Sequence, residues 1–261
     1  MSRRFVFAAL TAAVFAALPA FSVLAASMNY GDFVGDSVTY RNVTESNSEP
    51  NLLFSAPTVV GDTLEFDPVA FFAEVDPGPG SDITDSEINT IIEAQPGFFI
   101  DNIQITEEGD FTLTGLPGAF GHAGVGAAFF FEVLGVDGVL VGDGPIGFAS
   151  MQFTTGGGPN GGQYMLPGDA GNTTPWIGTA FLDINAALAA SPYAGQRSTS
   201  IRLSFDNTLS AAADENASSF IQKKEIGGII IRTNIPEPST LAMVGLVIGA
   251  AATVVMRRKL G

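Results

Sequence analysis

The feature that most constrains the fold of this chain is a set of short runs in which apolar and polar residues alternate. The clearest is Ser200 to Phe205, where Ile201, Leu203 and Phe205 alternate with polar neighbours. Alternation with a period of two places successive side chains on opposite faces of a β-strand. Further β-patterned runs occur at 62–66, 98–106, 110–116, 127–134, 146–154 and 225–233. The pattern therefore predicts many short strands.

Turn residues between these runs indicate how the strands connect. Asp137-Gly138 separates two apolar runs and is typical of a tight hairpin turn. We expect one short helix at 184–190, because Asp183 can cap its first turn. The crossover helices that a parallel sheet requires are missing. We therefore predict an all-β fold, an antiparallel β-sandwich or jelly-roll, in a single domain over residues 27–234.

Two stretches rich in glycine and proline predict long loops. They cover residues 76–82 and 155–175. Loops of this length often carry a function or are simply mobile. They are therefore the first places to look for ligands.

The N-terminus has the organisation of a secretory signal peptide. Arg3 and Arg4 precede an apolar stretch over residues 5–24, and small residues follow it. This order predicts signal-peptidase cleavage after Ala25 or Ala26 and passage through the general secretion machinery. We interpret residues 1–26 as a removable signal, with an uncleaved transmembrane helix as the alternative.

The C-terminal segment 235–261 contains three consecutive elements that predict a membrane anchor. Pro236-Glu237-Pro238 comes first, and its prolines disfavour helix in the residues before them. Residues 241–256 are uncharged and almost wholly apolar, and as a helix they would span roughly 24 Å of a hydrocarbon core about 30 Å thick. A basic cluster ends the chain: Arg257, Arg258 and Lys259. Because basic residues stay in the cytoplasm, we expect a weak transmembrane helix with the body outside the cytoplasmic membrane.

These three elements resemble the PEP-CTERM sorting tail of exported bacterial proteins. The resemblance implies a Gram-negative bacterium that makes exopolysaccharide and a membrane exosortase that recognises Pro236-Glu237-Pro238. It also implies transient anchoring in the inner membrane, followed by release or transfer to the cell surface or extracellular matrix. A protein that keeps its C-terminal anchor permanently is the alternative.

Charge and cysteine content restrict the classes of partner. The chain has 27 acidic and 11 basic residues, a net charge of −16, and no cysteine. Five of the basic residues lie in the two terminal signals, so the exported body is more acidic still. Such a body repels nucleic acid, whereas it tolerates divalent cations and basic partners. The absence of cysteine excludes disulfides, thiol nucleophiles and thiolate metal sites.

Catalytic motifs are scarce. His122 is the single histidine, and no nucleophile elbow, phosphate loop or His-Glu-x-x-His motif accompanies it. Acidic residues are numerous, so a pair of carboxylates suited to glycoside hydrolysis stays open as an alternative. We expect a protein that is not an enzyme.

Two candidate ligand sites remain. Calcium prefers oxygen ligands on glycine-rich loops, and the candidate ligands are Asp76, Asp82, Asp85 and Glu87. Apart from calcium, no cofactor is indicated. A sugar-stacking surface would use aromatic side chains, here Tyr164, Trp176 and Tyr193. We predict an exported structural protein associated with exopolysaccharide or biofilm; the alternatives are a carbohydrate- or calcium-binding adhesin and a secreted hydrolase.

Overall fold

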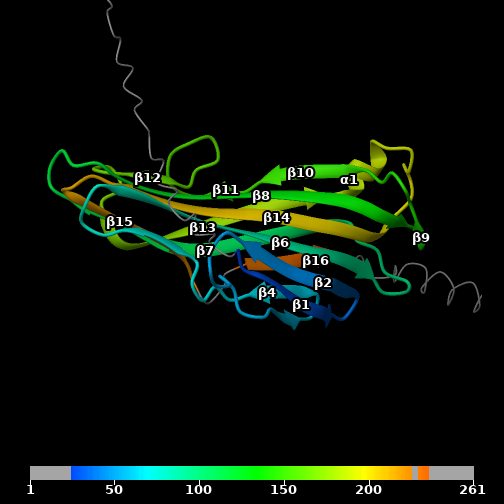
Figure 1. Ribbon diagram of the computed structural model, residues 1–261. Coiled ribbons are helices and arrows are strands. Elements are labelled where there is room, and N and C mark those ends of the chain that lie inside the picture. The colour runs from blue at the N-terminus through cyan, green and yellow to red at the C-terminus, as the bar shows by residue number, and fades with distance from the viewer. Residues whose placement is uncertain (1–24, 225–228, 235–261) are drawn as a thin grey trace, which may run out of the picture.

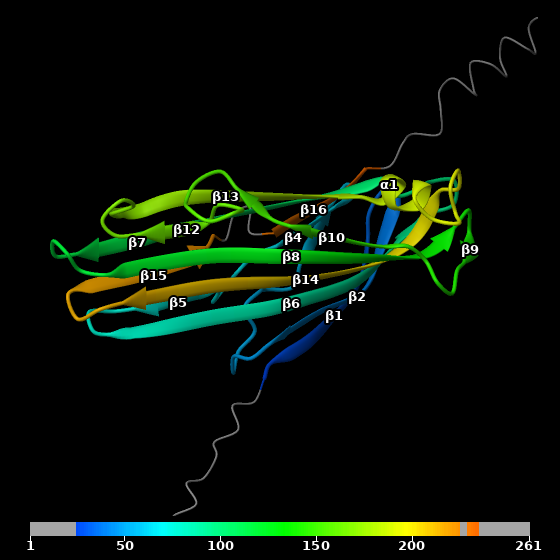
Figure 2. The ribbon, with the colours of Figure 1, turned by 90° about the horizontal axis from the view of Figure 1, so that it is seen from above.

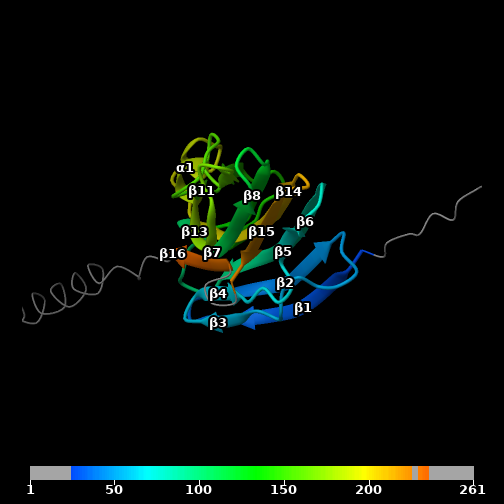
Figure 3. The same ribbon diagram turned by 90° about the vertical axis from the view of Figure 1, so that its left-hand side faces the viewer.

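Two curled antiparallel β-sheets make up most of the part of the protein that the structure describes. The computed structural model describes residues 25–224 and 229–234. The long strands of the two sheets run along the length of the body (Figure 1). Viewed from the side in Figure 3, β8, β14 and β6 lie on one side, and β13, β7 and β16 lie on the other. This arrangement is consistent with a β-sandwich, and every strand pairing within the described residues is antiparallel.

The first sheet has three long neighbouring strands at its centre, which Figure 2 shows side by side. Its order is β1 (Ser27–Val34), β2 (Val38–Asn47), β6 (Gly80–Ala94), β14 (Ser198–Ala213), β8 (Gly121–Val136) and β10 (Ile146–Ser150). Two short strands also pair with β8, namely β9 (Val139–Leu140) and β12 (Gln163–Met165). The register of β14 with β6 is unbroken from Ser200 to Ala213.

The second sheet is organised around β7. Its order is β11 (Gln152–Phe153), β13 (Gly171–Asp183), β7 (Asn102–Gly115), β16 (Ile229–Asn234), β4 (Thr63–Phe66) and β3 (Thr58–Val60). Strand β15 (Ala217–Lys223) pairs with both β7 and β5 (Phe72–Val75). One edge of β7 therefore binds β15 along its C-terminal half and β16 along its N-terminal half. The last strand within the described residues is therefore an interior strand of this sheet.

The core lies between the inward faces of the sheets. Period-two alternation produces it directly: along β14, Ile201, Leu203 and Phe205 are fully buried, whereas Arg202 is exposed. Aromatic rings fill much of the core. For example, the ring centroids of Phe129 on β8 and Phe205 lie 5.5 Å apart. Burying such side chains is the main favourable term in folding. The sandwich thus needs no disulfide to hold its layers together.

Several sequence predictions are confirmed. The hairpin between β8 and β9 turns at Asp137 and Gly138, which adopt φ values of 47° and 80°. These positive φ values belong to the turn type that asparagine, aspartate and glycine favour. The predicted helix is α1 (Ile184–Ala189), capped by the Asp183 carboxylate, which accepts a hydrogen bond from the Ala186 amide.

Other predictions need correction. The run 146–154 is not one strand: it breaks at Met151, so that β10 belongs to the first sheet and β11 to the second. The separate runs at 98–106 and 110–116 form a single strand, β7, which starts only at Asn102. The predicted loop 76–82 ends at Gly80, where β6 begins, and the predicted loop 155–175 contains β12 and the start of β13. Glycine and proline therefore mark these turns but overstate their length.

Both predicted targeting segments fall largely outside the described residues. Of the signal 1–26, only Ala25 and Ala26 are described, and of the tail 235–261, no residue is. Among the described residues, no helix is long and apolar enough to cross a membrane.

Candidate functional site

The boundaries of the β-body lie next to the predicted processing sites. At the N-terminus, the Ala26 amide donates to the Glu49 carbonyl, and the Ala26 carbonyl accepts from the Asn47 amide. Cleavage after Ala25 would keep these two hydrogen bonds, whereas cleavage after Ala26 would remove them. At the C-terminus, β16 ends at Asn234, immediately before the tail.

The sorting residues themselves lie outside the described residues. They are Pro236, Glu237, Pro238, Arg257, Arg258 and Lys259.

The four acids of the predicted calcium site do not form one cluster. Asp76 lies in the turn after β5, and the Asp82 carboxylate accepts a hydrogen bond from the Glu74 amide. Asp85 and Glu87 lie two residues apart on β6, so they share a face that Asp82 does not. In the described part of the chain, no group of three or more histidine or acidic side chains is placed to hold a metal ion.

Asp85 and Glu87 instead form an acidic surface with Asp206, which the sequence did not single out. Asp206 of β14 lies directly opposite Glu87 in the first sheet. Partial burial and the charges of Asp85 and Glu87 raise the pKa of Asp206 above its usual range. These three residues and Phe130 line a surface hollow of about 560 Å³. We call this region the acidic hollow.

One exposed aromatic ring lines the acidic hollow, and a second packs against it. Phe130 of β8 and Phe148 of β10 are opposite each other in register, with ring centroids 4.9 Å apart. They are 54% and 58% exposed, which is unusual for phenylalanine. The period-two pattern of β8 could have revealed Phe130, because Phe129 and Phe131 must face the core.

The predicted aromatic surface is wrong for two of its three members. Trp176 and Tyr164 are each 1% exposed, and Tyr164 stacks on Phe111 with ring centroids 3.9 Å apart. Neither ring can therefore stack on a sugar. Tyr193 is partly buried and packs against the core. His122 lies in β8, where its Nε2 is 2.8 Å from the Gln163 Oε1.

The most unusual group is a polar cluster in the core, made of Glu107, Lys223, Asn207 and Trp176. Lys223 of β15 and Glu107 of β7 form an ion pair in which both side chains are fully buried. The Lys223 Nζ also donates to the Asn207 Oδ1, 3.3 Å away on β14 of the facing sheet. The Lys223 Nζ also lies 5.2 Å from the ring centroid of Phe71 and 5.4 Å from that of Trp176. We call this group the core cluster.

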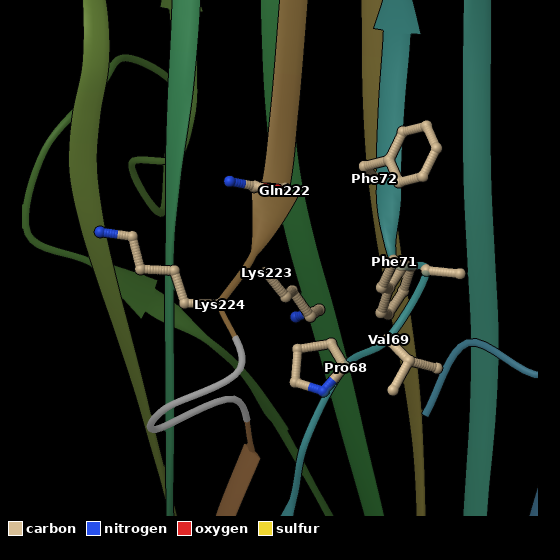
Figure 4. Close-up of a pocket in the computed structure, with 8 residues that line it drawn as sticks. Pro68, Val69, Phe71, Phe72, Gln222, Lys223 and Lys224 are labelled. Atoms are coloured by element: carbon tan, nitrogen blue, oxygen red, sulfur yellow. The ribbon is translucent and has the colours of Figure 1, made fainter. Parts of the chain in front are cut away.

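The direction of the Lys223 side chain separates it from its neighbour. Figure 4 shows Lys223 and Lys224 leaving the strand end in different directions, beside a cavity of about 420 Å³ that Phe71 also lines. Lys224 reaches Asp110 at 3.4 Å and stays 42% exposed. Removal from water lowers the pKa of Lys223 and raises the pKa of Glu107. Burial therefore favours the neutral amine and the neutral carboxylic acid over the charged pair.

The core cluster also contains polar atoms without partners. Within the described residues, the Glu107 Oε1, the Asn207 Nδ2 and the Trp176 Nε1 are buried and make no hydrogen bond. Buried polar groups in native proteins are almost always paired. No sequence pattern indicated this cluster, since its members come from four strands and no motif joins them.

Comparison with known proteins identifies the C-terminal segment. A family profile described as the PEP-CTERM protein-sorting motif matches residues 234–259. The chain carries a PEP-CTERM sorting motif. The motif marks an exported protein directed to an exosortase, and it begins at Asn234, the last residue of β16.

Comparisons of the body are less informative. A search of curated proteins gave no match. The family 11 xylanase from Neocallimastix patriciarum aligns with 81% of this chain and 100% of its own, at 12% identity and a TM-score of 0.20. A loop-swap mutant of Xyn11A from Neocallimastix patriciarum aligns over the same shares, at 11% identity and a TM-score of 0.23. Likenesses at these scores carry no argument about fold or activity.

Proposed function

We propose that this protein is a non-enzymatic structural component of the cell surface or extracellular matrix. In this proposal, signal peptidase removes residues 1–26, the helix at 241–256 holds the body briefly at the cytoplasmic membrane, and an exosortase processes the chain near Pro236-Glu237-Pro238. The observation that carries the proposal is the position of the motif. It starts where β16 ends, so cleavage at the prolines removes no residue of the described sheets.

The character of the body supports a structural role beside exopolysaccharide. Its single histidine bonds to Gln163, and the chain has no cysteine for nucleophilic chemistry. Its strong negative charge favours solubility and divalent cations or basic partners. A processed body would therefore stay hydrated in a matrix.

The acidic hollow supports a second candidate function, binding of a polysaccharide with or without calcium. Aromatic faces provide broad apolar contacts for sugar rings, and carboxylates accept their hydroxyl hydrogen bonds. Phe130 and Phe148 supply the aromatic faces, and Glu87 and Asp206 supply the carboxylates.

Intact mass spectrometry of the protein from its native host tests the sorting proposal. We expect a species that begins near Ala26 or Ser27 and ends close to Pro236, and any added mass would identify what replaced the tail. Substitution of Pro236, Glu237 and Pro238 by alanine should leave the tail in place. A native species that retains residues 241–261 would contradict processing and indicate a permanently anchored surface domain.

Binding to the host's own exopolysaccharide, with and without Ca²⁺, tests the second candidate. The double variant Phe130→Ala/Phe148→Ala should weaken binding at least tenfold, whereas the control Phe181→Ala, which removes an exposed ring from the second sheet, should not. Equal binding by all three proteins would remove this candidate. The alternative of a secreted hydrolase would instead be supported if the protein depolymerised the polysaccharide and if Glu87→Gln or Asp206→Asn abolished that activity.

A further inference from the structure

We propose that Lys223 and Asn207 form an intramolecular isopeptide bond, with Glu107 transferring the protons that the reaction requires. The bond would covalently join β15 of the second sheet to β14 of the first. This inference goes beyond the proposed function and does not depend on it, since none of the three residues belongs to either targeting segment.

The geometry places the reacting groups together. The Lys223 Nζ lies 3.3 Å from the Asn207 Oδ1, which is bonded to the carbon that an amine would attack. The same Nζ is hydrogen-bonded to the Glu107 Oε2. Each residue comes from a different strand, so the sandwich fold itself assembles the site. Holding an amine and a carbonyl in near-contact replaces a bimolecular encounter by a positioned one.

The unpartnered atoms distinguish this site from an ordinary buried ion pair. A stable buried pair normally has its remaining oxygens and hydrogens satisfied by other groups. Here the Asn207 Nδ2 and the Glu107 Oε1 are buried without partners. The nitrogen is the group that would leave, and the oxygen is the carboxylate atom of Glu107 to which Lys223 is not hydrogen-bonded. Two of the three unpaired atoms of the core cluster therefore belong to groups that the reaction uses.

The surroundings favour the reactive protonation states. The Lys223 amine must be neutral to act as a nucleophile. Desolvation lowers its pKa and raises that of Glu107, so both changes favour passage of a proton from the ammonium to the carboxylate. The side chains of Lys223 and Glu107 are fully buried, and the rings of Phe71 and Trp176 lie against the ammonium. Such burial limits the hydrolysis of an intermediate.

The reaction balances without an external reagent. Glu107 first accepts a proton from Lys223 and becomes a carboxylic acid, which can then polarise the Asn207 carbonyl. The amine lone pair forms a bond to the Asn207 carbonyl carbon, giving a tetrahedral intermediate. Glu107 gives its proton to the Asn207 nitrogen and accepts one from the former Lys223 amine. The bond between the Asn207 nitrogen and the carbon breaks, and ammonia leaves with the electron pair. The products are a secondary amide and one ammonia, with no oxidation or reduction.

Tryptic mapping of the full chain gives a direct test. Without the bond, trypsin cleaves after Arg202 and Lys223 and releases peptide 203–223. With the bond, the Lys223 side chain is an amide and resists trypsin. The expected product is then peptide 203–224, with a mass about 17 Da below that of the same peptide without the bond, because ammonia is lost. Subsequent cleavage after Glu215 should open the loop between the two residues, yet leave the pieces joined.

Four variants define the chemistry. Glu107→Gln should restore peptide 203–223 at full mass, and Lys223→Arg should prevent the cross-link. Asn207→Asp should lose water, about 18 Da, in place of ammonia, because the leaving group changes. Lys224→Arg is the matched control, since this neighbour lies outside the cluster, and it should remain cross-linked. Far-UV circular dichroism checks that each variant is folded.

Two outcomes would overturn the inference. One is wild-type protein that is folded and gives peptide 203–223 at full mass. The other is a loss of about 17 Da with Lys223 still cleavable by trypsin, which would indicate a succinimide at Asn207. Because the wild-type result decides, the test stands even if a variant fails to fold. Peptide 203–224 excludes both chain ends, so its mass is independent of whether the tail is processed.

Discussion

Gly109 is the residue that makes room for the core cluster. It lies on β7, opposite Trp176 on one side and Lys223 on the other. A Cβ at this position would lie 2.1 Å from the Gln222 carbonyl oxygen and 2.3 Å from the Trp176 ring. The absence of a side chain therefore lets the indole ring lie against the β7 backbone and beside the Lys223 ammonium.

Gly109→Ala should destabilise the protein by about 3 kcal/mol, because neither the backbone nor the buried ring can move aside without cost. Urea unfolding of the full chain measures the change. Gly126→Ala is the matched control: this glycine is also in a long central strand, but an added Cβ meets nothing within 4 Å. Equal stability of the two variants would contradict the close contact at Gly109.

Asp206→Asn should raise stability at neutral pH. The folded state raises the pKa of Asp206, so the carboxylate is less favourable there than in the unfolded chain. As the pH falls, Asp206 therefore takes up its proton at a higher pH in the native state than in the unfolded chain. The free-energy penalty of the native carboxylate disappears below the unfolded pKa of about 3.9.

Unfolding measured at pH 7 and pH 3 tests this sign. The variant should gain a few tenths of a kcal/mol at pH 7, a modest value because Asp206 is exposed on β14 and solvent screens its charge. The gain should vanish at pH 3 and shrink in about 1 M salt, which screens Asp85 and Glu87. A gain that grows as the pH falls would show that the sign is wrong.

At the scale of elements, local signals were reliable where one residue decides the geometry. Asp183 predicted α1 because a cap acts within one turn, and Asp137-Gly138 predicted the hairpin because the turn needs positive φ. The break at Met151 could not be predicted, since residues 146–154 keep a strand pattern throughout. Only packing against the facing sheet decides where the chain crosses from the first sheet to the second. The same limit applies to Glu107, Asn207 and Lys223, whose contact depends on how two sheets are stacked.

The cap of α1 can be tested directly. Asp183→Ala should cost about 1 kcal/mol, because the Ala186 amide loses its acceptor. Asp183→Asn should be nearly neutral, as an amide oxygen can accept the same hydrogen bond. Urea midpoints of the two variants provide the comparison, and equal midpoints would mean that the cap contributes nothing.

At the scale of the whole molecule, β16 connects two parts of the second sheet. Ile230 pairs with Thr106 of β7 on one side and with Glu65 of β4 on the other. Among the described strands, β4 pairs only with β16 and β3. The β3 and β4 hairpin therefore belongs to this sheet through the last strand.

Ile230→Pro should remove a ladder hydrogen bond in the sheet interior and cost roughly 3 kcal/mol. Limited proteolysis should then cut within residues 58–66, which lose their partner strand. Val60→Pro, at the exposed end of the edge strand β3, should have a much smaller effect. Unchanged protease resistance of the Ile230 variant would show that the hairpin is held by other contacts.

The interior position of β16 also sets an order of events for a secreted chain. A polypeptide that crosses the membrane with its N-terminus first delivers residues 229–234 after the rest of the body, just as the sorting motif begins at Asn234. Until those residues emerge, β7 and β4 have an unfilled gap between them. In the export route that we propose, the body therefore completes its second sheet only when its sorting tail arrives, so maturation of the fold and arrival of the tail become one synchronised step.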